Sequence, residues 1–264
     1  MDITSQLGLR AARNNGYVSV KEEGAVQIKG KTAVVTGATD GIGIEIARHL
    51  KAEGASVIVV GRDLARLDAA RSEGFEPIAA DLSTVTGCDA LVAALAGQPL
   101  DILVNNAGMG ADYDVGQPID LGAVDRCIFL NLNAPIRLIT GLLDTLRARP
   151  EAMIVNVTSG LAIAPSAGSP VYCGTKAGLR SFTMALRAQL SGTKLHVLEA
   201  LPPVVETQMT AGNNHKKMPA TECGRQIVAA IMRDRTQANI GMTAILNAVH
   251  NISPLIARQV MLRY

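Results

Sequence analysis

Residues 31–50, KTAVVTGATDGIGIEIARHL, constrain the fold of this chain more than any other stretch. A short β-branched run at residues 32–35 is typical of a buried parallel strand. A glycine-rich turn follows at residues 36–43, and apolar residues then recur at positions 42, 46, 47 and 50, which lie on one face of a helix. The stretch therefore predicts a strand, a tight turn and a helix.

The three glycines of this turn have different uses. Gly37 lets the chain turn sharply off the strand, Gly41 lets a phosphate approach bare backbone, and Gly43 lets the helix pack closely on the sheet. The start of the helix offers free N–H groups and the positive end of its dipole to a pyrophosphate. The spacing is G-x-x-x-G-x-G and not the G-x-G-x-x-G of the Rossmann fingerprint. The turn indicates a phosphate site, with a glycine-rich turn that binds nothing as the alternative.

Apolar runs alternate with helical patterns along the rest of the chain. Strands separated by helices of ten or more residues indicate βαβ units and a parallel sheet covered on both faces. We therefore expect an α/β fold, a Rossmann-like doubly wound parallel sheet that binds ligands beyond the carboxyl ends of its strands. The further predicted strands are 57–60, 77–80, 102–105, 153–157 and 195–200, and the predicted helices include 89–96, 123–147 and 172–190.

The length of 264 residues suits one large α/β domain. The apolar residues of segment 1–27 show no convincing helical or strand periodicity, and we expect a partly mobile N-terminal extension there. Residues 28–264 then make a single dinucleotide-binding catalytic domain, in which residues 208–221 are expected to form a mobile lid over the substrate. Residues 239–264 are a mostly apolar tail, expected, in this order, to cover the site, to form a subunit interface or to lie on a membrane surface.

Composition argues against several other classes of protein. The net charge of +2 and the absence of a basic tract do not favour nucleic-acid binding. The four cysteines lie far apart, without C-x-x-C or paired histidine spacing, which is typical of free thiols and predicts no metal site. No run approaches the ~18 apolar residues of a membrane span, and no signal segment precedes the first strand, so we expect a cytoplasmic protein.

Tyr172 and Lys176 stand four residues apart and so share one helix face. A free tyrosine has a pKa near ~10, and a nearby ammonium lowers it by favouring the phenolate. A shift to about 7 needs ~4 kcal/mol of differential stabilisation, which a lysine and a bound cationic nicotinamide could supply. The pair is a candidate acid–base couple, with an exposed helical pair without function as the alternative.

Six motifs occur in order, most of them at predicted strand ends: TGATDGIG at 36–43, NNAG at 105–108, Asn131, Ser159, YCGTK at 172–176 and PPVVET at 202–207. Together they resemble the motifs of the short-chain dehydrogenase/reductase family, in its single-domain form, over about residues 28–209. That family shows TGxxxGxG, NNAG, an Asn on the following long helix, a Ser thirteen residues before the Tyr of YxxxK, and PG-x-x-x-T. Pro203 replaces the glycine of the last motif, which adds bulk and removes an N–H beside the nicotinamide.

The resemblance implies a role for each catalytic candidate. Tyr172 would be the general acid in carbonyl reduction and the general base in the reverse direction. Lys176 would lower the pKa of Tyr172 and hold the nicotinamide ribose, and Ser159 would stabilise the charge that develops on the substrate oxygen. Asn131 would hold a water for proton resupply, or would be a buried structural hydrogen-bonder. Besides Tyr172 and Lys176, the implied cofactor contacts are Gly37, Thr39, Asp40, Gly41, Ile42, Gly43, Arg62, Asp81, Leu82, Asn105, Ala107, Gly108, Pro202, Val205 and Thr207.

The residues after the second strand bear on which cofactor is bound. An acid at the strand end would bind both ribose hydroxyls of NAD, but Gly61 stands there. Arg62 follows and could bind a 2′-phosphate. Asp63 matches the spacing of an acidic ribose ligand, or caps the next helix. Asp40 stands where many NADP-using relatives carry Arg or Lys. We favour NADP, with NAD as the alternative.

The resemblance implies an oxidoreductase that acts on a small-molecule carbonyl or alcohol, and family members form homodimers or homotetramers. An apolar ketone or aldehyde, reduced reversibly with NADPH, suits the loop positions near the site. The alternatives are an NAD-dependent alcohol dehydrogenase and a non-catalytic dinucleotide-binding sensor or assembly protein. The apolar loop positions are Met109, Leu161, Ile163, Val204, Val205 and Met209.

Overall fold

The computed structural model describes residues 26–212 and 216–263. Nearly all of the predicted N-terminal extension, and residues 213–215 of the predicted lid, lie outside the described residues. Val26 and Ile28, at the predicted domain boundary, are both buried in the core, and the Val26 N–H donates to the Met232 carbonyl at 2.8 Å.

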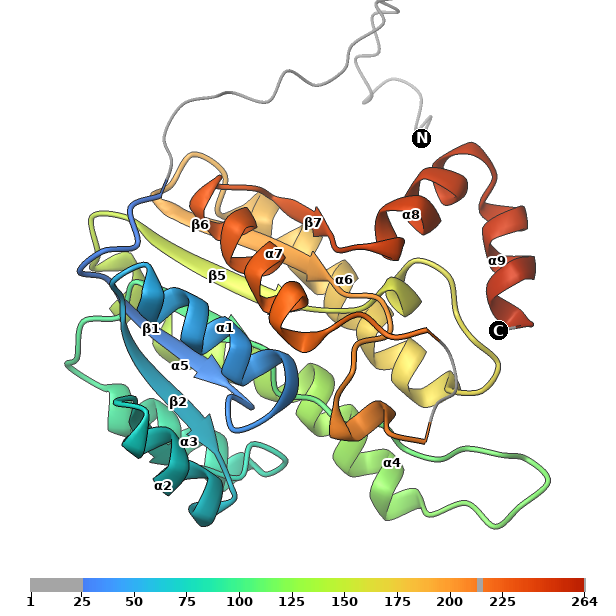
Figure 1. The fold of residues 1–264 in the computed structure, drawn as a ribbon, viewed down its shortest axis with the longest axis horizontal. Helices are drawn as coiled ribbons and strands as arrows, with labels where there is room; N and C mark the ends of the chain where they lie inside the picture. Colours follow the sequence, from blue (N-terminus) through green and yellow to red (C-terminus); the bar gives the residue numbers. More distant parts are fainter. Residues whose placement is uncertain (1–25, 213–215, 264) are drawn as a thin grey trace, which may run out of the picture.

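Seven parallel strands form one sheet in the order β3-β2-β1-β4-β5-β6-β7 (Figure 1), which confirms the predicted doubly wound parallel sheet. The sequence predicted six of these strands and missed the last. The strands are β1 Thr32–Thr36, β2 Ser56–Gly61, β3 Glu76–Ala79, β4 Ile102–Asn105, β5 Ala152–Val157, β6 Leu195–Leu201 and β7 Gln237–Asn239.

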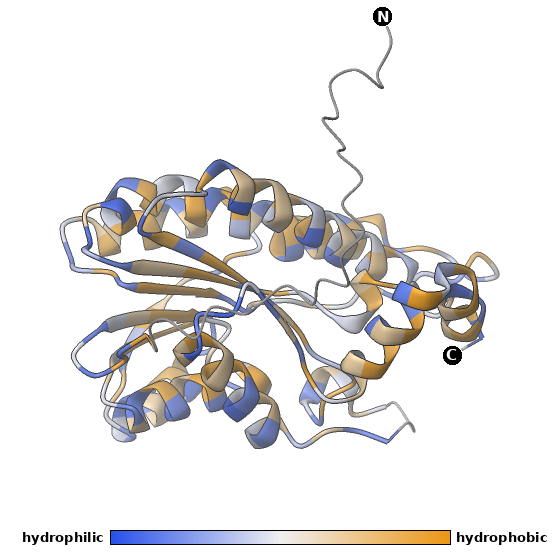
Figure 2. Ribbon diagram, turned by 90° about the horizontal axis from the view of Figure 1, so that it is seen from above, coloured by the Kyte–Doolittle hydropathy of each residue, from blue (hydrophilic) through white to orange (hydrophobic). Residues whose placement is uncertain are grey.

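Helices cover both faces of this sheet, which Figure 2 shows nearly edge-on between two helical layers. Helices α1, α2 and α7 share one core with the sheet, and α3, α5 and α6 share the other. The helices are α1 Gly41–Ala52, α2 Leu64–Ser72, α3 Val85–Leu95, α4 Leu121–Ile128, α5 Ala134–Arg147, α6 Pro170–Gln189, α7 Ala220–Met232, α8 Met242–Ile252 and α9 Pro254–Leu262, with shorter turns η2 Phe129–Asn133, η3 Gly160–Ala162 and η4 Gln208–Thr210.

The central strand β1 shows why its sequence is apolar throughout. Val35 lies in the core on the α1 side and Val34 in the core on the α5 side, and both are fully buried. Because successive side chains of a strand point to opposite faces, a sheet covered on both sides buries every residue of its central strands.

The strand order reverses at β1, which pairs with β2 on one side and with β4 on the other. Val35 of β1 lies opposite Val104 of β4, so the segments that leave these two strands emerge side by side. Ligands of doubly wound sheets bind in the crevice at this switch point. The glycine turn and the NNAG segment both lie there.

The helical segment Leu121–Arg147 is the one helix of residues 26–212 and 216–263 whose length and mean hydropathy of 1.2 would suit a membrane crossing. Its second part, α5, buries Leu138, Leu142 and Leu146 in the core beside the sheet. A helix buried in the core of a protein satisfies the same length and hydropathy criteria, so packing against the sheet explains the apolar composition of this segment.

Candidate active site

The glycine turn between β1 and α1 is pressed against two other segments of the site. Gly37 has φ +62, and a Cβ there would lie 2.8 Å from Ala107 Cα. Gly41 has φ +55, and a Cβ there would lie 2.9 Å from Thr207 Cγ2. Any other residue type at these two positions would be strained and crowded. The structure thus brings together the predicted cofactor residues of the turn, of NNAG and of the 202–207 segment.

Hydrogen bonds fix the exits of β1 and β4 to each other. Thr36 Oγ1 accepts from the N–H groups of Asn106 and Ala107, both at 3.0 Å. Asn105 donates from Nδ2 to Asn156 Oδ1 at 2.9 Å, while its own buried Oδ1 has no hydrogen-bond partner among the residues that the structure describes. A free acceptor at the end of β4, beside a turn with bare backbone, fits a bound dinucleotide.

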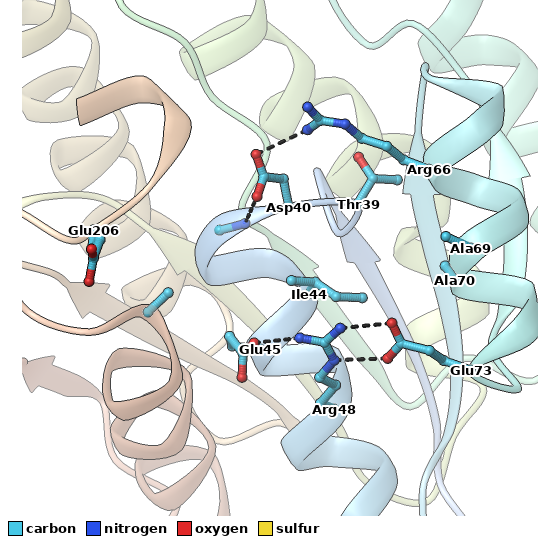
Figure 3. A pocket seen from close by; sticks show the side chains of 12 residues that line it. Thr39, Asp40, Ile44, Glu45, Arg48, Arg66, Ala69, Ala70, Glu73 and Glu206 are labelled. Atoms are coloured by element: carbon cyan, nitrogen blue, oxygen red, sulfur yellow. Dashed lines mark hydrogen bonds and ion pairs between the residues drawn. The ribbon is translucent and has the colours of Figure 1, made fainter. Parts of the chain in front are cut away.

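The start of α1 carries a charged cluster beside a cleft of about 380 Å³. Asp40 accepts from the Gly41 N–H at 2.7 Å and pairs with Arg66 Nη1 at 3.0 Å. Arg66 Nη2 also donates to Gln208 Oε1 at 3.1 Å. Figure 3 shows Asp40 and Arg66 pointing toward one another across the cleft. The guanidinium of Arg66 offsets the negative charge of the Asp40 carboxylate. Arg66 is not among the residues predicted for the site, because no motif marks its position.

At the end of β2, a side chain in place of Gly61 would crowd Thr39. A Cβ at Gly61 would lie 2.5 Å from Thr39 Cγ2, closer than real Cβ contacts come. Asp63 caps α2, since its Oδ1 accepts from the Arg66 N–H at 3.1 Å. Of the two roles that the sequence left open for Asp63, the structure therefore shows the helix cap.

Asp81 follows β3, and a local turn holds it. Its Oδ1 accepts from the Ser83 hydroxyl at 2.7 Å and from the Ser83 N–H at 3.0 Å. The hydroxyl hydrogen bond is the main cause that keeps the pKa of Asp81 below its ordinary value, with the charge of Arg62 as a smaller cause. The side chain of Leu82 is 5% exposed and belongs to the core, so a ligand could meet only its backbone.

Tyr172 and Lys176 lie one turn apart near the start of α6, where the Lys176 ammonium is 5.6 Å from the centre of the Tyr172 ring. Lys176 is 3% exposed and donates to the Val157 carbonyl at 2.9 Å. Burial lowers the pKa of Lys176 to about 8 and raises that of Tyr172 to about 12, although the Ser159 hydroxyl opposes the rise. In the ligand-free protein desolvation therefore moves the Tyr172 pKa upward. The predicted lowering required a bound cationic nicotinamide beside Lys176 and stays a prediction.

Ser159 follows β5 and starts the turn η3. Its Oγ accepts from the Leu161 N–H at 3.1 Å. Behind it, a Cβ at Gly160 would lie 2.9 Å from Thr243 Oγ1, so helix α8 packs directly against this loop. The Gly160 N–H donates to the Pro202 carbonyl at 2.9 Å, which joins the loop to the 202–207 segment.

Asn131 lies on the π turn η2 between α4 and α5 and is fully buried. Its Oδ1 accepts from the Met109 N–H at 2.9 Å, and its Nδ2 donates to the Met109 carbonyl at 2.8 Å and to Thr175 Oγ1 at 3.1 Å. A Cβ at Gly108 would lie 3.2 Å from Asn131 Oδ1 and 3.5 Å from Lys176 Nζ. The NNAG segment, Asn131 and Lys176 therefore converge, and one lone pair of Oδ1 remains for a further donor.

The apolar positions predicted near the site differ in exposure. Val205 is 3% exposed and lies in the core, whereas Met209 is 54% exposed on η4. Met109, Leu161, Ile163 and Val204 are partly buried.

Within the described part of the chain, no group of three or more His, Cys, Asp and Glu side chains could hold a metal ion.

Comparison with known proteins gives consistent matches. The family model "short chain dehydrogenase" matches residues 31–218. An uncharacterized oxidoreductase, DltE of Bacillus subtilis, is 39% identical over 197 residues, which are 73% of this chain and 78% of DltE. Serine 3-dehydrogenase of Agrobacterium fabrum is 36% identical over 187 residues, 68% of this chain and 74% of the relative. The structure of a short-chain dehydrogenase from Sphingobium yanoikuyae in complex with NADPH superposes with a TM-score of 0.76 at 26% identity, and the match covers 86% of this chain and 94% of that one.

Proposed function

This chain belongs to the short-chain dehydrogenase family of oxidoreductases, and on that basis we propose that it reduces an uncharged, largely apolar ketone or aldehyde with NADPH. The observation that supports the proposal most directly is that Tyr172 lies beside both the Lys176 ammonium, 5.6 Å from its ring centre, and the Ser159 hydroxyl at the end of β5. A nicotinamide dinucleotide supplies the hydride in such a reaction, and the protein supplies binding, orientation and proton transfer.

Tyr172 is proposed as the proton donor. With its pKa raised to about 12, the phenol stays protonated at neutral pH and can give a proton to a carbonyl oxygen. Lys176, with its pKa lowered to about 8, is still mainly cationic at pH 7. Its charge favours the phenolate that the donation leaves behind.

Ser159 and Asn131 are proposed to support this transfer. The Ser159 hydroxyl would donate to the substrate oxygen and stabilise the negative charge that develops there. Asn131 fixes the loop at Met109 with two hydrogen bonds, and the remaining lone pair of Oδ1 would hold the water that resupplies protons.

Three features favour NADPH over NADH. The first is that neither position after β2 offers an acid that would select NAD: Gly61 has no side chain, and Asp63 is engaged as a helix cap. Arg62 is exposed beside them and would pair with a 2′-phosphate. The Sphingobium yanoikuyae relative is solved with NADPH, which is the third feature.

A paired titration with NADPH and NADH, followed by nicotinamide fluorescence, tests the cofactor. We expect NADPH to bind at least tenfold more tightly, about 1.4 kcal/mol. Equal binding, or tighter binding of NADH, would contradict the proposed cofactor and favour the NAD-dependent alcohol dehydrogenase.

A panel of apolar ketones, serine and sugar alcohols tests the substrate class, with Tyr172→Phe as the catalytic variant. The variant should keep dinucleotide binding and lose at least ~10²-fold in kcat. Tyr113→Phe, on an exposed loop, is the matched control and should retain full activity. Dinucleotide binding without turnover of any compound would favour the non-catalytic sensor.

A further inference from the structure

Helices α8 and α9 form a C-terminal hairpin, residues 242–262, that stands out at one end of the molecule, away from α2 and α3 (Figure 1). Hydrophobic segments run along it (Figure 2). Seven of its large apolar side chains are 44–86% exposed. They are Met242, Ile245, Ile252, Leu255, Ile256, Val260 and Leu262.

Such a surface is unusual for a folded chain in water. At roughly 180 Å² for a fully exposed residue of this size, these fractions amount to about 750 Å² over the two helices, whereas the largest contiguous apolar patch of a typical monomer is ~300–600 Å². On α8, Met242, Ile245 and Ile252 fall on one side of the helix, while Thr243 on another side is buried against Gly160. The fold therefore already uses one side of α8 and leaves its apolar side unpartnered.

The charges of the same segment are of one sign. The sequence after Asp234 contains no Asp or Glu, and its charged residues are Arg235, Arg258 and Arg263. Arg258 and Arg263 are exposed on or directly after α9, among its apolar side chains. Exposed apolar side chains whose charged neighbours are all basic are typical of helices that lie in the surface of an anionic membrane.

We propose that the C-terminal hairpin docks this protein on an anionic lipid bilayer. Helices of 11 and 9 residues are too short to cross the ~30 Å hydrocarbon core, so the hairpin lies in the interface. Its apolar side chains enter the boundary of the acyl chains, and Arg258 and Arg263 reach the lipid phosphates.

Charge decides between the bilayer and a second copy of the chain as the occupant of this face. Two hairpins packed against each other would bring the arginines of both copies to one interface, and residues 235–264 contain no Asp or Glu side chain to pair with them. An anionic bilayer supplies the missing negative charge. The inference does not depend on the proposed substrate or cofactor.

The test is cosedimentation of the full-length protein with phosphatidylcholine vesicles that contain 0 or 30% phosphatidylglycerol. We expect binding to the anionic vesicles, weakened by salt, and little binding to pure phosphatidylcholine. Arg258→Gln/Arg263→Gln should lower the partition coefficient about 30-fold at low salt, which corresponds to about 2 kcal/mol for two charges.

Met242→Asp/Ile252→Asp tests the apolar contribution and should abolish vesicle binding. Its matched control is Leu64→Asp/Val85→Asp, which changes exposed apolar residues on α2 and α3 at the other end of the molecule. The match is close because Leu64 and Met242 are each the first residue of a helix and each 67% exposed. The control should bind vesicles like the unmodified protein.

Failure to bind anionic vesicles would overturn the proposal, as would equal losses in the two Asp variants. A dimer in size-exclusion chromatography with light scattering, converted to a monomer by Met242→Asp/Ile252→Asp without any vesicle binding, would assign the face to a second copy instead.

Discussion

Replacing Lys176 by methionine should make the ligand-free protein more stable at neutral pH while it removes activity. Burial lowers the pKa of Lys176 from 10.5 to about 8. At 1.36 kcal/mol per pH unit, this difference means that the charged lysine costs the folded state about 3 kcal/mol. Methionine avoids that cost but loses the hydrogen bond to the Val157 carbonyl, worth about 1 kcal/mol. We expect the free energy of unfolding at pH 7 to rise by about 2 kcal/mol.

The pH dependence of this gain separates desolvation from other causes. Below pH 8 the lysine is charged in both the folded and the unfolded state, and its full cost is present. Between about 8 and 10.5 the folded protein has released the proton while the unfolded chain still holds it, so raising the pH stabilises the unmodified protein relative to the variant. The advantage of Lys176→Met should therefore shrink through this window and reverse to about −1 kcal/mol above it.

Urea unfolding followed by circular dichroism at pH 7, 8, 9 and 10 measures both quantities at one protein concentration. The exposed Lys194 supplies the matched control, since Lys194→Met should change the free energy of unfolding by less than ~0.5 kcal/mol at each pH. A variant that is no more stable at pH 7, with a difference that does not change up to pH 10, would refute the reasoning from desolvation.

Three further changes test other parts of the site and its scaffold. Asp63→Ala should lower the free energy of unfolding by about 1 kcal/mol through loss of the α2 cap. It should leave the ratio of the NADPH and NADH dissociation constants unchanged. A shift in that ratio would show that Asp63 is a ribose ligand. Arg180→Met should cost about 3–5 kcal/mol in urea unfolding, because it leaves the fully buried carboxylate of Glu199, 2.9 Å from the guanidinium, without its cation. Gly61→Ala should weaken dinucleotide binding by crowding Thr39, and Thr39→Ala should restore it in the double variant; additive losses would exclude this contact as the cause.

The sequence predicted the strands well where an apolar run marks them, including β3 at one edge of the sheet. Six predicted strands agree with the observed ones to within one residue at each end, because uninterrupted apolar runs between helical patterns admit few other interpretations. The missed strand, β7 Gln237–Asn239, lies at the edge of the sheet and consists of partly buried residues. A three-residue edge strand of the sequence QAN carries no apolar run by which it could be found.

Motif spacing predicted which residues meet, but not how the charged ones are engaged. Arg66 belongs to no motif, and only the fold brings it within 3.0 Å of Asp40 and 3.1 Å of Gln208, across 26 and 142 residues of sequence. The π turn around Asn131 was not predicted either, since a helical pattern does not distinguish one wide turn from regular α-helix.

The acid–base pair shows most clearly what spacing can and cannot determine. Four residues of separation put Tyr172 and Lys176 on one helix face, and that prediction follows from helix geometry alone. The direction of their pKa shifts depends on how much protein surrounds the pair, which is a property of the whole fold: burial opposes the charge on both groups, raising one pKa and lowering the other. A site that keeps a charged lysine desolvated destabilises its own folded state. Lys176 is the residue best suited to lower the Tyr172 pKa once a cationic nicotinamide is bound. For the same reason its removal should stabilise the protein without cofactor.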